Sequence, residues 1–237
     1  MDEQKFIEEA KKELEHFYSP YFVSEEELQN FLYGVFDYEN GSLEKRQMIF
    51  QVQRFVSLAN DIDKIRPARD PLRVLFLKIG LDALSSLAGY TSKKKKVFYR
   101  DFCKCFSKDA TDYILNNFKL SSFDDEYNGH SFKVSHDIDL NDFLNIIKTT
   151  RDAVVHDFTY WEMQFFAYDT DSVWCTSIET DEDIILSYKY RRKAKKVTTY
   201  NFETTLNYER FIYYFTEACV NFISNQKIMS TVKGEFL

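Results

Sequence analysis

Arg151 and His156 are the two side chains whose types and spacing most directly suggest chemistry. They lie in the stretch 140–158 (LNDFLNIIKTTRDAVVHDF), whose apolar residues recur at alternating steps of three and four, as on one face of a helix. Arg151 falls on that apolar stripe, where its guanidinium must meet a carboxylate, a phosphate or a water-filled cleft because it cannot shed its charge. Asp152 precedes His156 by one helical turn, which is close enough to hold the imidazole ring.

A single helix does not bring these two groups together. Arg151 and His156 are separated by about 140° around an ideal helix, so they do not share a face. They flank one groove only if a second surface packs across the helix. In the other interpretation, Arg151 makes a structural ion pair and His156 sits favourably at a helix C-terminus.

The spacing Arg-Asp-x-x-x-His, with four residues between Arg151 and His156, resembles the Arg-x(4–6)-His signature of the HEPN superfamily. The resemblance covers residues 45–160 and the last helix. It implies an α-helical bundle that dimerises. Many members of this superfamily are metal-independent endoribonucleases of toxin–antitoxin, abortive-infection and other defence systems, whereas others have lost catalysis and only bind.

The resemblance also implies roles for individual residues. Arg151 would offset charge on the phosphorane oxygens, His156 would transfer or position a proton, and Asp152 would orient His156. RNA that is cleaved by its own 2′-hydroxyl needs no metal and no cofactor. Two copies facing each other across a homodimer would point both groups at one phosphate.

Aromatic and basic side chains downstream of the motif are candidates for RNA binding. Tyr160 lies one turn beyond His156, and the run 191–196 (RRKAKK) forms the tip of a predicted hairpin, where clustered cations displace counterions from phosphates. The candidate substrate-binding residues are Tyr160, Arg191, Arg192, Lys193, Lys195 and Lys196. A packed surface tyrosine and a charge run that keeps the protein soluble are the alternatives.

A helix over 70–88 carries a charged residue that matches Arg151. Asp70 is the expected N-cap, Pro71 suits the first turn and Gly89 suits the C-terminal stop. Asp82 interrupts an apolar stripe of this helix, much as Arg151 interrupts the other. We expect a structural ion pair between Asp82 and Arg151; alternatively, Asp82 lies at the edge of the stripe in water.

Composition limits the class of protein. The chain has 23 Phe and 16 Tyr but only 6 Gly and 3 Pro in 237 residues, which favours long helices over a many-turned β fold. Its net charge of −7 argues against a protein that coats nucleic acid indiscriminately. The charged N-terminus carries no secretion signal, no apolar run is long enough to span a membrane, and the four cysteines lack disulfide or zinc spacing. The sequence therefore predicts a cytoplasmic protein with no membrane partner and no metal site.

The pattern of elements predicts a mainly α fold. Helices are expected at 2–17, 24–36, 43–65, 70–88, 93–106, 108–118, 139–158 and 207–225, with a polar loop at 119–138 that contains His130 and His136. Short strands at 172–178, 184–190 and 197–202 predict a small antiparallel β meander before the last helix. We divide the chain into an N-terminal helical extension (1–42), a HEPN-like helical core (43–160), the β meander (161–205) and a C-terminal helix that completes the bundle (206–237).

We therefore expect a HEPN-like helical bundle that works as a homodimer in the cytoplasm. The first functional hypothesis is a ribonuclease of a bacterial defence or toxin–antitoxin system, with RNA as substrate and an antitoxin protein as partner. The alternative is a non-catalytic HEPN-type module that binds RNA, a nucleotide or a protein.

Overall fold

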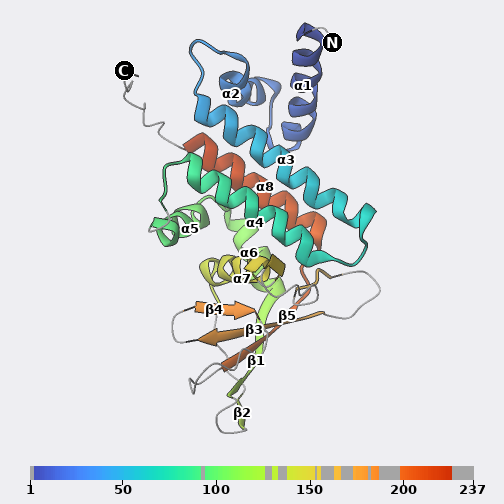
Figure 1. Ribbon diagram of the computed structural model, residues 1–237, viewed down its shortest axis with the longest axis vertical. Helices are drawn as coiled ribbons and strands as arrows, with labels where there is room; N and C mark the ends of the chain where they lie inside the picture. Colours follow the sequence, from blue (N-terminus) through green and yellow to red (C-terminus); the bar gives the residue numbers. More distant parts are fainter. Residues whose placement is uncertain are drawn as a thin grey trace.

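The protein is mainly helical, with one antiparallel sheet at one end of the molecule (Figure 1). The computed structural model describes residues 3–91, 94–125, 130–132, 138–152, 154–155, 163–166, 173–180, 183–186 and 198–225. Helices α1 and α2 lie at the end opposite the sheet, and α3, α4 and α8 form the middle of the bundle (Figure 1). Helix α7 lies between α4 and the sheet (Figure 1). The prediction of a helical chain with a small antiparallel sheet before the last helix is confirmed.

The helices follow the sequence patterns closely. Their bounds are α1 Glu3–Tyr18, a 3-10 turn at Ser19–Tyr21, α2 Glu25–Phe36, α3 Leu43–Ile65, α4 Asp70–Leu87, α5 Lys95–Cys103, α6 Lys108–Asn117, α7 Leu140–Asp152 and α8 Tyr208–Asn225. Serine residues cap three of them: Ser24, Ser42 and Ser107 each accept a hydrogen bond from the backbone N–H three residues later. Asn207 caps α8 in the same way, by accepting from the backbone N–H of Arg210.

Of the two predicted ends of α4, the C-terminal one is confirmed and the N-terminal cap is wrong. Gly89 has a φ of 77°, and the N–H groups of Gly89 and Tyr90 bond to the carbonyls of Ser86 and Ser85, which is the Schellman arrangement that ends a helix. Asp70, in contrast, is not the N-cap. Arg69 occupies that position without a side-chain cap, and Asp70 is the first helical residue, with its carboxylate turned to other partners.

Aromatic rings fill the core. Phe98 and Phe102 of α5 pack against Phe222 of α8, with ring centroids 5.4 and 5.8 Å from that ring. Phe143 of α7 packs edge-on against Phe211 of α8. Each such ring removes a large apolar surface from water, worth about 1.5–3 kcal/mol when fully buried. This aromatic core fixes α7 against the rest of the bundle.

The sheet is larger than the sequence predicts. Its strands are β1 Phe118–Asp125, β2 His130–Phe132, β3 Val173–Thr180, β4 Asp183–Leu186 and β5 Thr198–Thr204, in the order β2-β1-β5-β3-β4 with antiparallel pairing throughout. The prediction of a loop over 119–138 is therefore wrong for β1 and for β2, which contains His130. The strands after α7 also do not form a simple meander, because β5 pairs with β3 and β1 rather than with β4.

β1 joins the sheet to the bundle. It follows α6 directly, and Phe118 at its start is fully buried, stacked on Phe202 of β5 and edge-on to Phe143 of α7. The sheet therefore includes residues from within the predicted helical core. The division of the chain into domains stays a prediction. Within the described residues, no helix combines the length and apolar character needed to cross a membrane.

Candidate active site between α4 and α7

Helix α7 presents Arg151 to α4. Asp139 and Asp142 exchange hydrogen bonds at its start, each carboxylate accepting the other residue's backbone N–H, at 2.8 and 3.2 Å. Phe143 and Ile147 then fix the inner face of the helix, since both are fully buried. Arg151 comes one turn after Ile147 on this face, so its side chain emerges beside α4.

Arg151 meets a carboxylate of α4. Its Nη2 donates to Oδ2 of Asp82 over 3.0 Å, which brings together the pair expected from the two interrupted stripes. The two side chains are 25% and 24% exposed, so the pair lies at the edge of the packed interface. A guanidinium at such an edge is fixed in direction by its carboxylate and is still accessible from the surface of the molecule.

Lys78 is a third member of this cluster, and the sequence analysis missed it. Its Nζ lies 2.6 Å from the same Oδ2 of Asp82, and its side chain is only 2% exposed. The ammonium also lies 5.6 Å from the ring centroid of Tyr99 on α5. Lys78, Asp82 and Arg151 together form what we call the Asp82 cluster, in which one carboxylate receives two cations.

Lys78 was missed because the buried face of α4 is rotated around the helix from the face that the sequence pattern predicts. The sequence pattern predicts one stripe of Leu72, Leu75, Ile79, Asp82 and Ser86, widened by Val74, Leu77, Leu81 and Leu84. In the structure the widening residues are buried, together with Lys78, Gly80 and Ser85, and the predicted central stripe is not. The spacing of four residues from Lys78 to Asp82 is that of a helical ion pair, and it could have identified the lysine. Ser85 lies on the same inner face, and its hydroxyl is buried without a hydrogen-bond partner among the described residues.

Most other predicted site residues lie outside the described residues. Asp152 is the last residue of α7, but its side chain is not described. His156 and Tyr160 lie outside the described residues, as do the predicted substrate-binding residues Arg191, Arg192, Lys193, Lys195 and Lys196. After α7, Val154 is buried and Val155 is 44% exposed in a π-helical turn. Residues 154 and 155 therefore still have a helical backbone, immediately before His156 in the sequence.

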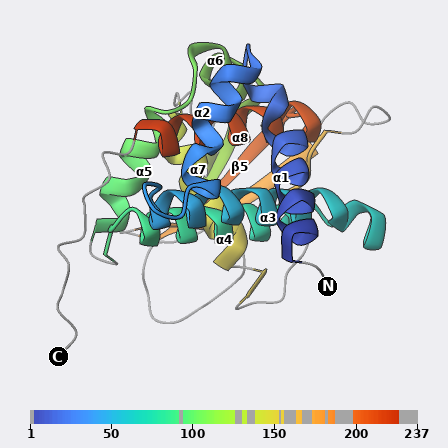
Figure 2. The same cartoon turned by 90° about the horizontal axis from the view of Figure 1, so that it is seen from above.

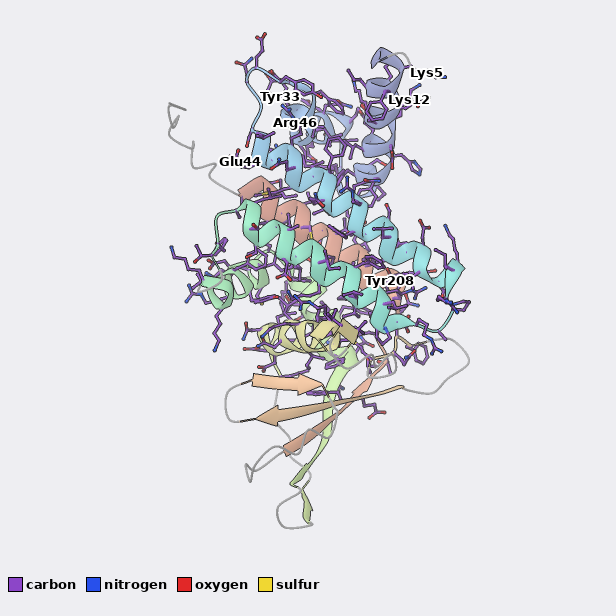
Figure 3. The ribbon with its side chains drawn as sticks, in the orientation of Figure 1. Lys5, Lys12, Tyr33, Glu44, Arg46 and Tyr208 are labelled. Atoms are coloured by element: carbon purple, nitrogen blue, oxygen red, sulfur yellow. The ribbon has the colours of Figure 1, made fainter. Side chains whose placement is uncertain are left out.

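A second ion cluster lies nearer the start of α4. Arg73 bridges Asp63 and Asp70 with N–O distances of 3.1 Å to each, and its guanidinium lies 4.1 Å from the ring centroid of Tyr208 (Figure 3). Asp70 also accepts the backbone N–H of Phe165 over 2.7 Å. We call Asp63, Asp70 and Arg73 the Asp70 cluster; it ties the segment 163–166 to the bundle.

Burial raises the pKa of one cluster carboxylate and of two cysteines. It raises the pKa of Asp70 above 3.8, although the Phe165 N–H and Arg73 act in the opposite direction. Burial also raises the pKa of Cys103 to about 12 and that of Cys105 to about 11, so neither is a reactive thiolate near neutral pH. Among the described residues, no three His, Cys, Asp or Glu side chains are grouped to hold a metal ion.

Comparison with known proteins leaves the family open. No protein-family model matches the chain, and no curated protein and no solved structure matches it. The resemblance to the HEPN superfamily therefore rests on the spacing of Arg151 and His156.

Proposed function

We propose that this chain is a HEPN-like protein in which Arg151 and His156 form a metal-independent endoribonuclease site. The observation that carries the proposal is the setting of Arg151. It lies on the packed face of α7, is fixed by Asp82 across the α4–α7 interface and is a quarter exposed. A guanidinium held this way can donate to phosphate oxygens with little reorganisation, because its direction is set beforehand.

The proposed reaction follows from the chemistry of RNA. The 2′-oxygen attacks the adjacent phosphorus while its proton passes to a base, and the bond from phosphorus to the 5′-oxygen breaks as that oxygen takes up a proton. His156 moves or positions the proton, and Asp152 orients the imidazole. Arg151 offsets the charge that builds on the phosphorane oxygens. A guanidinium keeps its charge in proteins, so Arg151 acts as a fixed charge and not as the base.

The Asp82 cluster supplies the rigidity that this role needs. Lys78 is buried and holds the Asp82 carboxylate from the α4 side, so the carboxylate has a fixed position when Arg151 binds it. We propose that Asp82 and Lys78 are positioning residues, which act through Arg151. Tyr160 and the basic run 191–196 are the proposed contacts to the rest of the RNA.

The cellular role belongs to the same proposal. A cytoplasmic homodimer would place Arg151 and His156 of two subunits around one phosphate, and a defence or toxin–antitoxin system would supply an antitoxin protein that restrains cleavage. Expression of the chain should then slow bacterial growth, and expression of His156→Ala should not.

RNA cleavage tests the proposal directly. Purified protein is incubated in EDTA with mixed-sequence RNA, beside Arg151→Ala, His156→Ala and the control Arg54→Ala, which removes an exposed arginine of α3. The parent and Arg54→Ala should cleave and leave 2′,3′-cyclic phosphate ends, and the other two should be slower by at least about 100-fold. Equal cleavage by all four proteins, or by none, rejects the enzyme.

One observation favours a second candidate, a non-catalytic HEPN-type module that binds RNA, a nucleotide or a protein. Arg151 already has the carboxylate of Asp82 as a partner, as in a purely structural ion pair. If no protein in the assay cleaves RNA, fluorescence anisotropy with the same RNA separates the possibilities. Binding that Arg151→Ala weakens and Arg54→Ala leaves unchanged supports the module.

A further inference from the structure

Helices α1 and α2 form a unit that projects from the bundle. Figure 2 shows them crossing over α3, at the end far from the sheet. The two helices run antiparallel, since Gln29 bonds to Glu15 over 2.8 Å whereas Phe36, further along α2, lies under Lys11, earlier in α1. The second half of α1 is anchored by Leu14 and by Tyr18, whose hydroxyl donates to the carbonyl of Ile49 over 2.7 Å.

The first two turns of α1 leave their apolar face uncovered. Phe6 and Ile7 precede Leu14 and Tyr18 at helical spacing, so the four side chains share one side of the helix. Leu14 and Tyr18 are 1% and 0% exposed, whereas Phe6 and Ile7 are 60% and 39% exposed. The face that packs on the bundle thus continues outward as an apolar surface.

Tyr33 of α2 is a further exposed aromatic side chain beside α1. It follows Gln29 by four residues and precedes Phe36 by three, so it lies on the side of α2 that faces α1. Its side chain is 57% exposed. By helical spacing, Lys5 and Lys12 lie on the opposite side of α1 from Leu14; both are labelled in Figure 3, on this outermost helix. We call the exposed apolar surface of Phe6, Ile7 and Tyr33 the α1 face. One cation borders it, since Lys11 lies one helical turn after Ile7, and this lysine is paired with Glu15 over 3.7 Å.

Exposed apolar side chains and negative charge are both concentrated in this part of the chain. Among the described residues, six of the eleven exposed large apolar side chains belong to residues 1–44: Phe6, Ile7, Val23, Tyr33, Tyr38 and Leu43. The same 44 residues contain 12 Asp or Glu and 3 Lys or Arg, a net charge of −9, whereas the rest of the chain contains 26 and 28, a net charge of +2. The α1 face thus lies in a strongly negative field within a chain that is elsewhere almost balanced.

The negative charge of residues 1–44 determines which kind of molecule can bind the α1 face. RNA and anionic lipid are repelled by a region of charge −9, and a second copy related by a two-fold axis would bring two such regions together. A positively charged protein segment is attracted. We propose that the α1 face binds an amphipathic helix of a protein partner, with leucine-like side chains on Phe6, Ile7 and Tyr33 and lysine or arginine on its other side. This inference goes beyond the ribonuclease proposal and does not depend on it.

A pair of synthetic helical peptides tests the chemistry of the partner. Both carry the same leucine stripe, one with lysine and the other with glutamate at all remaining positions, and each is titrated with the full chain in a fluorescence anisotropy assay. The lysine peptide should bind at least tenfold more tightly than the glutamate peptide, and its affinity should fall as salt is raised. Equal affinity for the two peptides, or binding of neither, would overturn the proposal.

Substitutions locate the binding to the α1 face. Phe6→Ser with Ile7→Ser should weaken the lysine peptide at least tenfold, whereas Ile65→Ser, which replaces a side chain 70% exposed at the end of α3, should not. All three side chains are exposed, so thermal unfolding should show folded proteins. If both variants lose affinity for the lysine peptide equally, or if neither loses affinity, the attraction is non-specific and the proposal is overturned.

The other occupants give distinct results. Light scattering that shows a dimer converted to a monomer by the Phe6→Ser, Ile7→Ser change would mean that a second copy covers the face. Binding to phosphatidylglycerol vesicles that the same change abolishes would mean a membrane surface. Either result contradicts the proposal, which expects neither the oligomeric state nor vesicle binding to respond to the change.

Discussion

The two ion clusters on α4 are built in opposite ways. In the Asp70 cluster, one guanidinium, 12% exposed and stacked on Tyr208, lies between the carboxylates of Asp63 and Asp70. In the Asp82 cluster, one carboxylate receives two cations, and the guanidinium of Arg151 is 25% exposed. The first is a clamp whose cation is turned inward to hold chain segments together. The second holds a cation where a ligand can reach it, which is what a phosphate-handling role requires.

Loss of the central carboxylate of the Asp82 cluster should have the largest effect on stability. Asp82→Ala leaves the ammonium of Lys78, which is 2% exposed, without its 2.6 Å carboxylate. We expect the free energy of unfolding to fall by about 3–5 kcal/mol, as when one partner of a buried ion pair is removed. Urea denaturation measures this, and Asp61→Ala, which breaks an exposed pair with Lys64, is the control. A loss no larger than that of the control would show that Asp82 does not hold Lys78.

Loss of Arg73, whose guanidinium is turned inward, should have the second-largest effect on the free energy of unfolding. Arg73→Ala leaves the carboxylate of Asp70 buried without its cation, so we expect unfolding free energy to fall by about 2–4 kcal/mol. RNA cleavage by the protein that remains folded should be unchanged, because the cluster lies at the other end of α4. A cleavage defect in folded Arg73→Ala would erase the distinction between the two clusters.

Loss of Arg151, whose guanidinium is turned outward, should lower the free energy of unfolding only slightly. The Arg151–Asp82 pair is partly exposed and screened by solvent, so Arg151→Ala should lower the free energy of unfolding by about 1 kcal/mol or less. Thermal or urea unfolding of this variant beside Arg73→Ala makes the comparison direct. If Arg151→Ala destabilises as much as Arg73→Ala does, Arg151 is a structural residue like its counterpart.

The pH dependence of stability gives the smallest and most specific test of the Asp70 cluster. Because burial raises the pKa of Asp70 above 3.8, the folded protein holds this proton at a higher pH than the unfolded chain does. The resulting stabilisation is fully present below the unfolded pKa and is lost as pH rises through the folded pKa. The stability of the parent relative to Asp70→Asn should therefore decrease between pH 4 and pH 7 in urea titrations. A relative stability that increases over this range would mean that the partners of Asp70 outweigh its burial.

The sequence predicted what depends on neighbouring residues. Serine caps, Gly89 and the residue before Pro67 determine the ends of α2, α3, α4 and α6 through local hydrogen bonds and backbone preferences, and these ends lie where predicted or within a residue or so. The pairing of Asp82 with Arg151 was also accessible, because each residue interrupts an apolar stripe and the two have opposite charge. Asp70 was the local exception, since its carboxylate bonds to Phe165, far along the chain.

What the sequence did not predict depends on distant partners. β1 forms because β5, far along the chain, supplies its hydrogen bonds, and its own sequence, FKLSSFDD, is polar enough to resemble a loop. Lys78 is buried because α5 and α7 cover that side of α4, which periodicity within α4 alone does not reveal. Sequence patterns give the face of a helix only approximately when several of its sides are apolar.

We propose above all that Asp82 holds Arg151 in the direction in which its guanidinium can stabilise the phosphorane oxygens. The most direct test of this proposal is the single-turnover cleavage rate of RNA in EDTA for the parent, Arg151→Ala and Arg73→Ala, each shown to be folded under the assay conditions. We predict that Arg151→Ala is slower than the parent by at least about 100-fold while folded Arg73→Ala cleaves at the parent's rate. Cleavage by Arg151→Ala at the rate of the parent would contradict the account.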